Sequence, residues 1–454
     1  MRKGRSRVVV ASLALALAAC ERGGSPPEPG FGALDEQLRR TIANWGVIPI
    51  LPVPAQEPAL VELGRALFFD NVLSGNRDIS CATCHHPSLH AGDGLSLAVG
   101  TGGSGLGESR APGEGRDLLP RNAPSLLNRG LGQTYTFWDG RLAEHGRGHF
   151  VTPVGSSLPS GLVNVLAAQA MLAVADRGEM RGTHGDVDAF GQHNELAAVE
   201  DGQYATIWQR VMQRLTAITA YVSLLERAYS QTPAAALTFR HAANAIAAFQ
   251  LEELTKVGTP FDRYLARDDA ALTMDEKRGA LLFFGEARCA FCHNGPLLGG
   301  QSFANVGAPQ IGPGMHAAPP LDLGRAEVED LSFYLFAFRV PPLRNVELTA
   351  PYMHSGAYTT LEAVVRHYTD VPLAMREYDV SQLHPSLRDR WHGDAATIEA
   401  VSATLDHRVS QQLQLSDEQI QELLAFLKAL TDPAARDLSR LTPASVPSGL
   451  PVVR

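Results

Sequence analysis

The sequence predicts a mainly α-helical protein made of two related halves. The pattern Cys-x-x-Cys-His occurs twice, as CATCH at residues 81–85 and as CAFCH at residues 289–293. Each copy follows a similar stretch with apolar residues at helical spacing, ELGRALFF at 62–69 and EKRGALLFF at 276–284. Each copy also precedes a run of the form (Ala/Val)-Pro-x-Leu-x-Asn. Because the order is the same both times, we infer an internal duplication of one unit.

The first 30 residues have the composition of an export signal and a linker. In residues 1–20, basic side chains precede an apolar run that is short for a permanent transmembrane helix. This arrangement is typical of a cleaved signal peptide. The run ends in Leu-Ala-Ala-Cys20, which resembles the bacterial lipobox and predicts lipidation of Cys20. An ordinary signal peptide with an incidental cysteine is the alternative. Residues 21–30 (ERGGSPPEPG) read as a flexible tether, so we expect a periplasmic, membrane-anchored lipoprotein.

The Cys-x-x-Cys-His pattern has the chemistry of covalent haem attachment. Two thiols about one helical turn apart add across the vinyl groups of one haem, and the adjacent histidine lies beneath the iron. A zinc site would need a second Cys or His pair near each run, and the sequence has none. We therefore predict two haem c groups, held by Cys81, Cys84, His85, Cys289, Cys292 and His293. With Cys20 this accounts for all five cysteines, so no disulfide is expected.

Helical spacing continues between and after the haem motifs. Residues 204–229 and 233–249 are predicted helices, and 416–430 is a closing helix with a capping box formed by its first residues. We expect two cytochrome-c-like haem domains, residues 31–253 and 254–454. The net charge of −9 suits a basic redox partner and argues against nucleic-acid binding.

Four further motifs carry a resemblance to a known family. They are RNAPSL at 121–126, FWDGR at 137–141, Glu-Met at 179–180 and RVPPLRNVELTAPYMHSG at 339–356. With the two haem motifs, they make the chain similar to the bacterial di-haem cytochrome c peroxidase/MauG superfamily, from about residue 60 to the closing helix. The resemblance implies that the N-terminal haem reacts with peroxide and that the C-terminal haem receives electrons and passes them inward.

One departure from the peroxidases concerns the first haem. They place a histidine sixteen residues after the first proximal histidine, where it caps the iron at rest. Here that position is Thr101, which is not a usual haem ligand. This predicts an iron that is open to peroxide without an activating rearrangement. His86 and His90 are close in sequence and remain alternative capping ligands.

A second departure concerns the other haem. The peroxidases place a methionine fourteen residues after the histidine of the Tyr-x-His-x-Gly run, but here this position is Tyr368. Leu361, Val364 and Tyr368 share one helix face, which directs Tyr368 rather than His367 toward the haem. The MauG type also has tyrosine at this position. A packed core tyrosine beside another ligand is the alternative.

The resemblance also implies the groups around the reacting peroxide. The family uses a glutamine and a glutamate ten residues apart, which Gln169 and Glu179 match. Glu179 would act as acid and base, and Gln169 would orient peroxide. Trp138 corresponds to the tryptophan between the haems, which carries electrons. The alternative for Gln169 and Glu179 is that they are two polar residues on a helix surface. The alternative for Trp138 is a buried core tryptophan.

A calcium ion between the domains is a further implication of the family. Its ligands would be Asn122 and the carbonyl groups of Thr349 and Pro351, which are hard oxygen donors.

The predicted function is oxidoreduction: a di-haem peroxidase that reduces hydrogen peroxide to water with electrons from a small cytochrome c or copper protein. One alternative is MauG-like oxidation of a partner-protein side chain. That type has a surface tryptophan two residues before its second haem motif, and here Ala287 stands there. Oxidation of a partner would then use another exit such as Tyr358 or Trp391. A di-haem electron carrier without peroxide chemistry is the second alternative.

Overall fold

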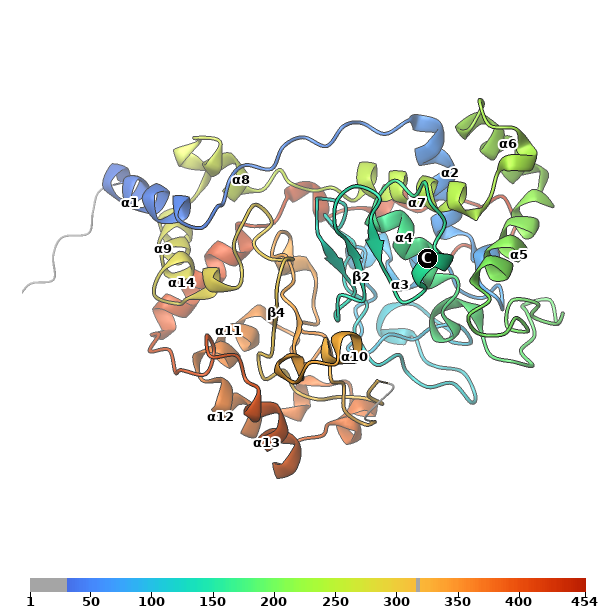
Figure 1. Ribbon diagram of the computed structural model, residues 1–454. Coiled ribbons are helices and arrows are strands. Elements are labelled where there is room, and N and C mark those ends of the chain that lie inside the picture. Colours follow the sequence, from blue (N-terminus) through green and yellow to red (C-terminus); the bar gives the residue numbers. More distant parts are fainter. Residues whose placement is uncertain (1–30, 316–318) are drawn as a thin grey trace, which may run out of the picture.

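The computed structural model describes residues 31–315 and 319–454, and the protein is mainly helical, as predicted (Figure 1). The predicted signal peptide, Cys20 and the tether lie outside these residues. No helix within the described ranges is both long and apolar enough to cross a membrane. The four cysteines in these ranges form no disulfide, which agrees with the sequence prediction.

A close crossing of two helices forms the centre of the first half. Helix α2 (Pro58–Phe69) packs against α7 (Phe239–Glu253) at Gly64, where a Cβ would lie 1.9 Å from the carbonyl oxygen of Ala245. Only glycine allows this approach. The rings of Phe68 and Phe249 pack beside the crossing, with centroids 5.2 Å apart.

The second half repeats this crossing. Helix α9 (Met274–Phe284) packs against α14 (Asp417–Lys428) at Gly279, where a Cβ would lie 1.8 Å from the carbonyl oxygen of Glu422. The ring of Phe426 contacts that of Phe283, as Phe249 contacts Phe68 in the first half. The repeated crossing supports the duplication that was inferred from sequence.

The remaining helices surround these two crossings (Figure 1). In the first half they are α3 (Cys81–Cys84), α4 (Val165–Ala173), α5 (Tyr204–Thr216) and α6 (Thr219–Ala228). In the second half they are α8 (Pro260–Leu265), α10 (Ala326–Glu329), α11 (Leu361–Thr369), α12 (Val371–Arg376) and α13 (Ala395–Ala403).

Two sequence predictions about helix boundaries need correction. The predicted helix at 204–229 is two helices, α5 and α6, which are separated by Ala217 and Ile218. The predicted helix at 233–249 begins later, because α7 starts after Thr238. The capping box of the closing helix is confirmed, since Ser416 Oγ accepts the Gln419 N–H at 3.2 Å.

Short antiparallel strands lie between the halves in the view of Figure 1. Strands β1 (Tyr135–Thr136), β2 (Leu142–Glu144) and β3 (Phe150–Val151) form one sheet in that order, and β4 (Phe303–Ala304) pairs with β5 (Phe338–Arg339). Strand β5 and the loop after β1 are joined where the Arg339 N–H donates to the Trp138 carbonyl at 2.7 Å. These strands hold the FWDGR motif against the second half.

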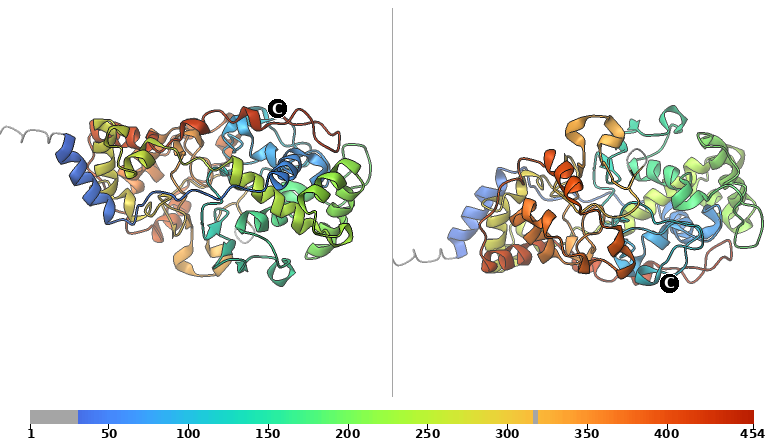
Figure 2. Two further views of the ribbon diagram at one scale, coloured as in Figure 1. Left: turned by 90° about the horizontal axis from the view of Figure 1, so that it is seen from above. Right: turned by 90° about the horizontal axis from the view of Figure 1, so that it is seen from below.

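The first described helix and the C-terminal segment pack across the predicted domain boundary (Figure 2). Helix α1 (Phe31–Ala43) contributes Leu38 and Ile42 to the core of the second half. The C-terminal segment after α14 contributes Leu441 and Leu450 to the core of the first half. Helix α1 thus completes the core of the second half, and the C-terminal segment completes the core of the first half. The domain boundary between residues 253 and 254 stays a prediction.

Candidate haem-binding and peroxide-reaction site

The first Cys-x-x-Cys-His motif forms the short helix α3, so Cys81 and Cys84 lie one turn apart. His85 follows, and its Nδ1 lies 3.2 Å from the Ala91 carbonyl oxygen. This contact assigns the proton to Nδ1 and leaves Nε2 as the metal ligand. Burial lowers the pKa of His85 to about 4, so the imidazole is neutral at physiological pH. A neutral imidazole is the form that binds iron.

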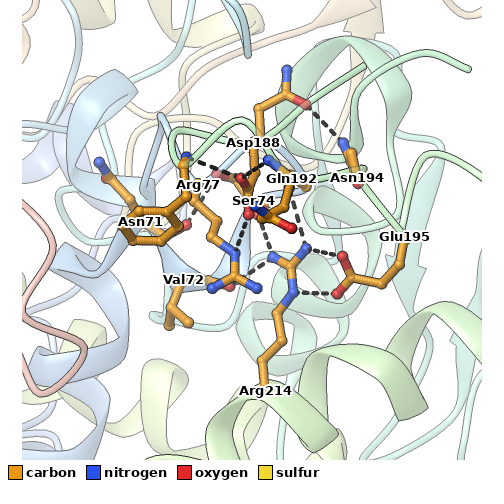
Figure 3. A network of polar contacts seen from close by, with 12 residues as sticks. Asn71, Val72, Ser74, Arg77, Asp188, Gln192, Asn194, Glu195 and Arg214 are labelled. Carbon is orange, nitrogen blue, oxygen red and sulfur yellow. Dashed lines mark hydrogen bonds and ion pairs between the residues drawn. The ribbon is translucent and has the colours of Figure 1, made fainter. Parts of the chain in front are cut away.

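A buried polar network braces the turn between α2 and this motif (Figure 3). Arg214 of α5 donates to the carbonyl oxygens of Val72, at 3.1 Å, and Ser74, at 2.6 Å, while it forms an ion pair with Glu195. This turn leads directly into the haem motif. The network therefore anchors the backbone a few residues before α3.

Glu179 lies close to the first haem motif on a π-helical turn, Arg177–Arg181. The N–H of Glu179 donates to Asp176 Oδ1 at 2.8 Å, which caps the turn. The charge of Glu179 acts on both Cys81 and Cys84, which places the carboxyl group near the thiols that attach the haem. Burial, with the nearby charge of Asp176, raises the pKa of Glu179 to about 8. A carboxyl group with this pKa exchanges protons near neutral pH.

Thr101 holds the Glu179 turn in place. Its N–H donates to the carbonyl oxygens of Gly178 and Glu179, at 3.2 and 3.1 Å, and its hydroxyl donates to Asp78 at 2.8 Å. Gly100 touches the same turn, because a Cβ there would lie 1.8 Å from the Gly178 carbonyl oxygen. The residue at the position of the family's capping histidine therefore holds the Glu179 turn in place.

The two alternative capping histidines are both bound elsewhere. His86 Nε2 lies 3.3 Å from the Val453 carbonyl oxygen, and its Nδ1 lies 2.6 Å from Ser88 Oγ. His90 Nδ1 lies 3.1 Å from the Ala435 carbonyl oxygen. Both side chains thus hold the C-terminal segment against the first half, which leaves the predicted open coordination position as the simpler interpretation.

Gln169 and Trp138 occupy neighbouring elements. Gln169 is partly buried on α4, which ends four residues before the Glu179 turn begins. Trp138 is 8% exposed and donates from Nε1 to the Asn122 carbonyl at 2.9 Å, and it also lines the pocket of the second haem motif. Trp138 is therefore held between elements of both halves.

The second haem motif forms a 3₁₀ turn, Cys289–Phe291, and ends at His293. The same hydrogen-bond arrangement recurs, because His293 Nδ1 lies 3.1 Å from the Leu298 carbonyl oxygen. Burial lowers the pKa of His293 to about 4. An apolar pocket surrounds the motif, lined among others by Phe283, Leu343, Met353, His354, Leu361, Val364 and Leu427.

Tyr368 of α11 also lines this pocket, with Leu361 and Val364 of the same helix face. Its neighbour His367 points elsewhere, since His367 Nε2 lies 2.8 Å from the Val306 carbonyl oxygen and Nδ1 accepts from the Tyr358 hydroxyl at 2.9 Å. Both nitrogens of His367 are occupied. The predicted orientation of the helix face agrees with the structure, and iron ligation by Tyr368 stays a prediction.

The buried side chain of Arg339 bears on whether this pocket can hold a haem. The side chain is 1% exposed and lines the pocket, and within the described residues its Nη2 has no hydrogen-bond partner. Burial and the neighbouring Arg129 lower the pKa of Arg339 well below its usual range, because the charge has too little compensation. A haem propionate is an anion of the required kind. The thiols, the imidazole, the apolar lining and this cation together fit a covalently bound haem.

Comparison with known proteins agrees with this assignment. Residues 58–270 match the di-haem cytochrome c peroxidase family. The chain is 33% identical over 312 residues to the methylamine utilization protein MauG of Methylorubrum extorquens, covering 68% of this chain and 69% of that protein. The chain belongs to the di-haem cytochrome c peroxidase/MauG family.

Two further relatives extend the comparison. Cytochrome c551 peroxidase of Pseudomonas aeruginosa is 32% identical over 304 residues, which cover 67% of this chain and 70% of the peroxidase. The crystal structure of a MauG-like protein associated with microbial copper homeostasis aligns with 87% of this chain and 95% of its own, with a TM-score of 0.59 and 25% identity. As a family member, the chain is an oxidoreductase with two haem c groups. No cluster of three or more His, Cys, Asp or Glu side chains suited to a metal ion occurs in the described ranges.

A chain of ion pairs, which sequence reasoning missed, links the Glu179 turn in the first half to Asp322 in the second half. Arg121 binds Asp322 in the second half through two hydrogen bonds, at 2.6 and 2.8 Å, and binds Asp139 at 2.6 Å. Asp139 also accepts from Arg141 at 3.0 Å, and Arg141 approaches Glu179 at 3.7 Å. Burial acts to raise the pKa of Asp139, but the positive charges of Arg121 and Arg141 outweigh this effect and hold that pKa below its usual range. The sequence shows the charged residues of the RNAPSL and FWDGR motifs, but not their ion-pair partners, which are distant in the chain.

The predicted calcium ligands come from two adjacent segments. The N–H of Asn122 donates to the His354 carbonyl at 2.7 Å, which places Asn122 beside the loop that contains Thr349 and Pro351. An amide oxygen and two carbonyl oxygens suit calcium, which takes six to eight oxygen ligands including water. Calcium binding stays a prediction.

Proposed function

We propose that this protein reduces hydrogen peroxide to water at the His85 haem, with electrons from a small redox protein. The observation that carries the proposal is Glu179, a partly buried carboxyl group with a pKa of about 8 whose charge reaches Cys81 and Cys84. Family membership supports the same reaction.

The side chains around Glu179 supply the proton transfers. When bound at His85, the haem would supply the redox-active iron that gives up electrons to peroxide. Glu179 as carboxylate takes the proton from one peroxide oxygen and returns it to the other as the O–O bond breaks. Gln169 donates a hydrogen bond that orients the peroxide. Arg141, 3.7 Å from Glu179, favours the carboxylate form and so limits the rise of its pKa.

Electrons reach this site from the second half. Trp138 contacts both halves, and it is the side chain we assign to electron transfer between the haems. Tyr368 would be a ligand of the His293 haem iron, and a phenolate there would stabilise the oxidised state of the iron. Arg339 would pair with a propionate of that haem.

Location and partners follow from the charge and the predicted export signal. A net charge of −9 favours a basic small cytochrome c or a copper protein as electron donor. Export to the periplasm, lipidation of Cys20 and a calcium ion at Asn122, Thr349 and Pro351 complete the proposal.

A second candidate function is peroxide-driven oxidation of a partner-protein side chain. It is favoured by Thr101, which is bound to Asp78 and the Glu179 turn, and by Tyr368 in the second haem pocket. Tyr368 matches the tyrosine of the MauG type, and Thr101 replaces the capping histidine of the peroxidases. The 33% identity to a methylamine utilization protein MauG supports this candidate as well.

One experiment separates these functions. Stoichiometric peroxide is added to the fully oxidised holoprotein, and optical and EPR spectra are recorded with and without a reduced small cytochrome c. A rapid response followed by turnover with the cytochrome supports the peroxidase. A slowly decaying response that the cytochrome does not accelerate favours oxidation of a partner protein. No response before half-reduction would contradict the open coordination position inferred from Thr101.

A further inference from the structure

A row of aromatic side chains leads from the second haem pocket to the protein surface. Tyr368 in the pocket contacts His367, with ring centroids 5.3 Å apart, and His367 accepts a hydrogen bond from Tyr358 at 2.9 Å. Beyond this point the rings of Tyr358 and Tyr378 are 5.5 Å apart, and those of Tyr378 and Trp391 are 5.7 Å apart. Each ring thus contacts the next.

The inner part of this row is buried and the outer end is accessible. Tyr358 is 4% exposed and Tyr378 is 7% exposed, and both belong to one apolar cluster with Leu97 and Ile311. Trp391 is only partly buried at the edge of the same cluster. Its neighbour Arg390 is 41% exposed and pairs with Asp117, so Trp391 lies at a solvated surface.

We infer that Trp391 is a surface site where an external one-electron donor is oxidised, with the electron carried inward through Tyr378 and Tyr358 to the Tyr368 pocket. Tyrosine and tryptophan are the side chains with redox-active rings, and this row consists of them apart from His367. The structure thereby joins Tyr358 and Trp391, which the sequence offered as alternative exits, in one path. The inference rests on the proposed function, because peroxide supplies the oxidising equivalents.

The electron and proton balance closes along this row. One hydrogen peroxide takes up two electrons and two protons to give two water molecules, and the electrons arrive one at a time. Trp391 gives up an electron inward and is refilled by the donor. When Tyr358 gives up an electron, its phenolic proton moves along the hydrogen bond to His367 Nδ1 and returns when Tyr358 is refilled. The Tyr378 hydroxyl donates to the Ala357 carbonyl, which is no base, so Tyr378 acts as a bridge that keeps its proton.

The test uses the holoprotein with ferrocyanide as the one-electron donor. The protein is oxidised with stoichiometric peroxide, mixed with ferrocyanide in a stopped-flow instrument, and followed by the return of the resting haem spectrum. We expect Trp391→Phe and Tyr378→Phe to slow the return about tenfold, whereas Trp391→Tyr, which keeps a redox-active ring, restores most of the rate. A merely structural role would tolerate phenylalanine and tyrosine alike.

A matched control and a chemical readout complete the test. Trp45 is another partly buried tryptophan near the second haem motif, but its ring contacts Phe291, which is not redox-active. Trp45→Phe should leave the rate unchanged. Peptide mass spectrometry after peroxide treatment without donor should find oxygen added to Trp391, and less of it in Tyr378→Phe.

Two outcomes would overturn the inference in distinguishable ways. A normal peroxide response with unchanged donor oxidation in Trp391→Phe, or a loss in Trp45→Phe alone, would refute the Trp391 path and leave the proposed function standing. A wild-type protein that does not respond to peroxide would refute the proposed function and this inference with it.

Discussion

The pH dependence of the reaction with peroxide is set by Glu179. With a pKa of about 8, roughly 9% of the protein carries the Glu179 carboxylate at pH 7 and roughly 91% at pH 9. Since the carboxylate is the base that accepts the peroxide proton, the second-order rate constant should rise about tenfold between these pH values, with a midpoint near 8. Stopped-flow measurement of the oxidised protein with excess peroxide gives this profile directly.

Variants of the same site test the assignment. Glu179→Gln should lower the rate constant by about 10²–10⁴ and remove the dependence on pH, because an amide accepts no proton here. Arg141→Gln removes the positive charge 3.7 Å from Glu179, so the midpoint should move to higher pH, whereas Arg141→Lys should change it less. Glu108→Gln, at an exposed position of the same half, is the control. A wild-type profile that is flat from pH 6 to 9, or a pH dependence that persists in Glu179→Gln, would refute the reasoning.

Three further predictions concern the second haem and the packing. Tyr368→Phe should alter the optical spectrum of the second haem and leave that of the first unchanged. Tyr352→Phe, which changes another tyrosine of the same pocket, should leave both spectra unchanged. An unaltered spectrum in Tyr368→Phe would rule out iron ligation by Tyr368. Arg339→Met removes a buried positive charge beside that haem, so its reduction potential should fall in a spectroelectrochemical titration, and an unchanged potential would exclude the propionate contact. Gly64→Ala forces a Cβ against the Ala245 carbonyl and should cost about 1–3 kcal/mol of unfolding free energy, whereas Gly32→Ala, with open space around it, should be nearly neutral in thermal unfolding.

Local sequence patterns correctly predicted those structural features that depend on residues close together in the chain. The spacing of Cys81 and Cys84 requires one helical turn, and the structure forms that turn. The helix face of Leu361, Val364 and Tyr368 likewise follows from helical geometry, and all three line one pocket. In both cases the relevant contacts lie within about two turns of chain, so periodicity alone determines them.

The parts that sequence reasoning missed depend on contacts between distant segments. The pairing of Arg121 with Asp322 joins residues 201 positions apart, and nothing in either local sequence indicates the partner. His86 and His90 looked like possible haem ligands, because their contacts with the C-terminal segment are equally remote in the chain. The start of α7 at Phe239 was misjudged because Thr232-Pro233 offers an equally good local start signal.

The exchange of terminal segments makes the order of synthesis important. The core of the first half includes Leu441 and Leu450, and its buried Asp70 accepts from Ser448 Oγ at 2.6 Å. Helix α1, the first described element, packs against α9 and α8 of the second half. Neither core can therefore be completed until nearly the whole chain has been made, and a nascent first half, even with its haem attached, still waits for the last residues to close over it.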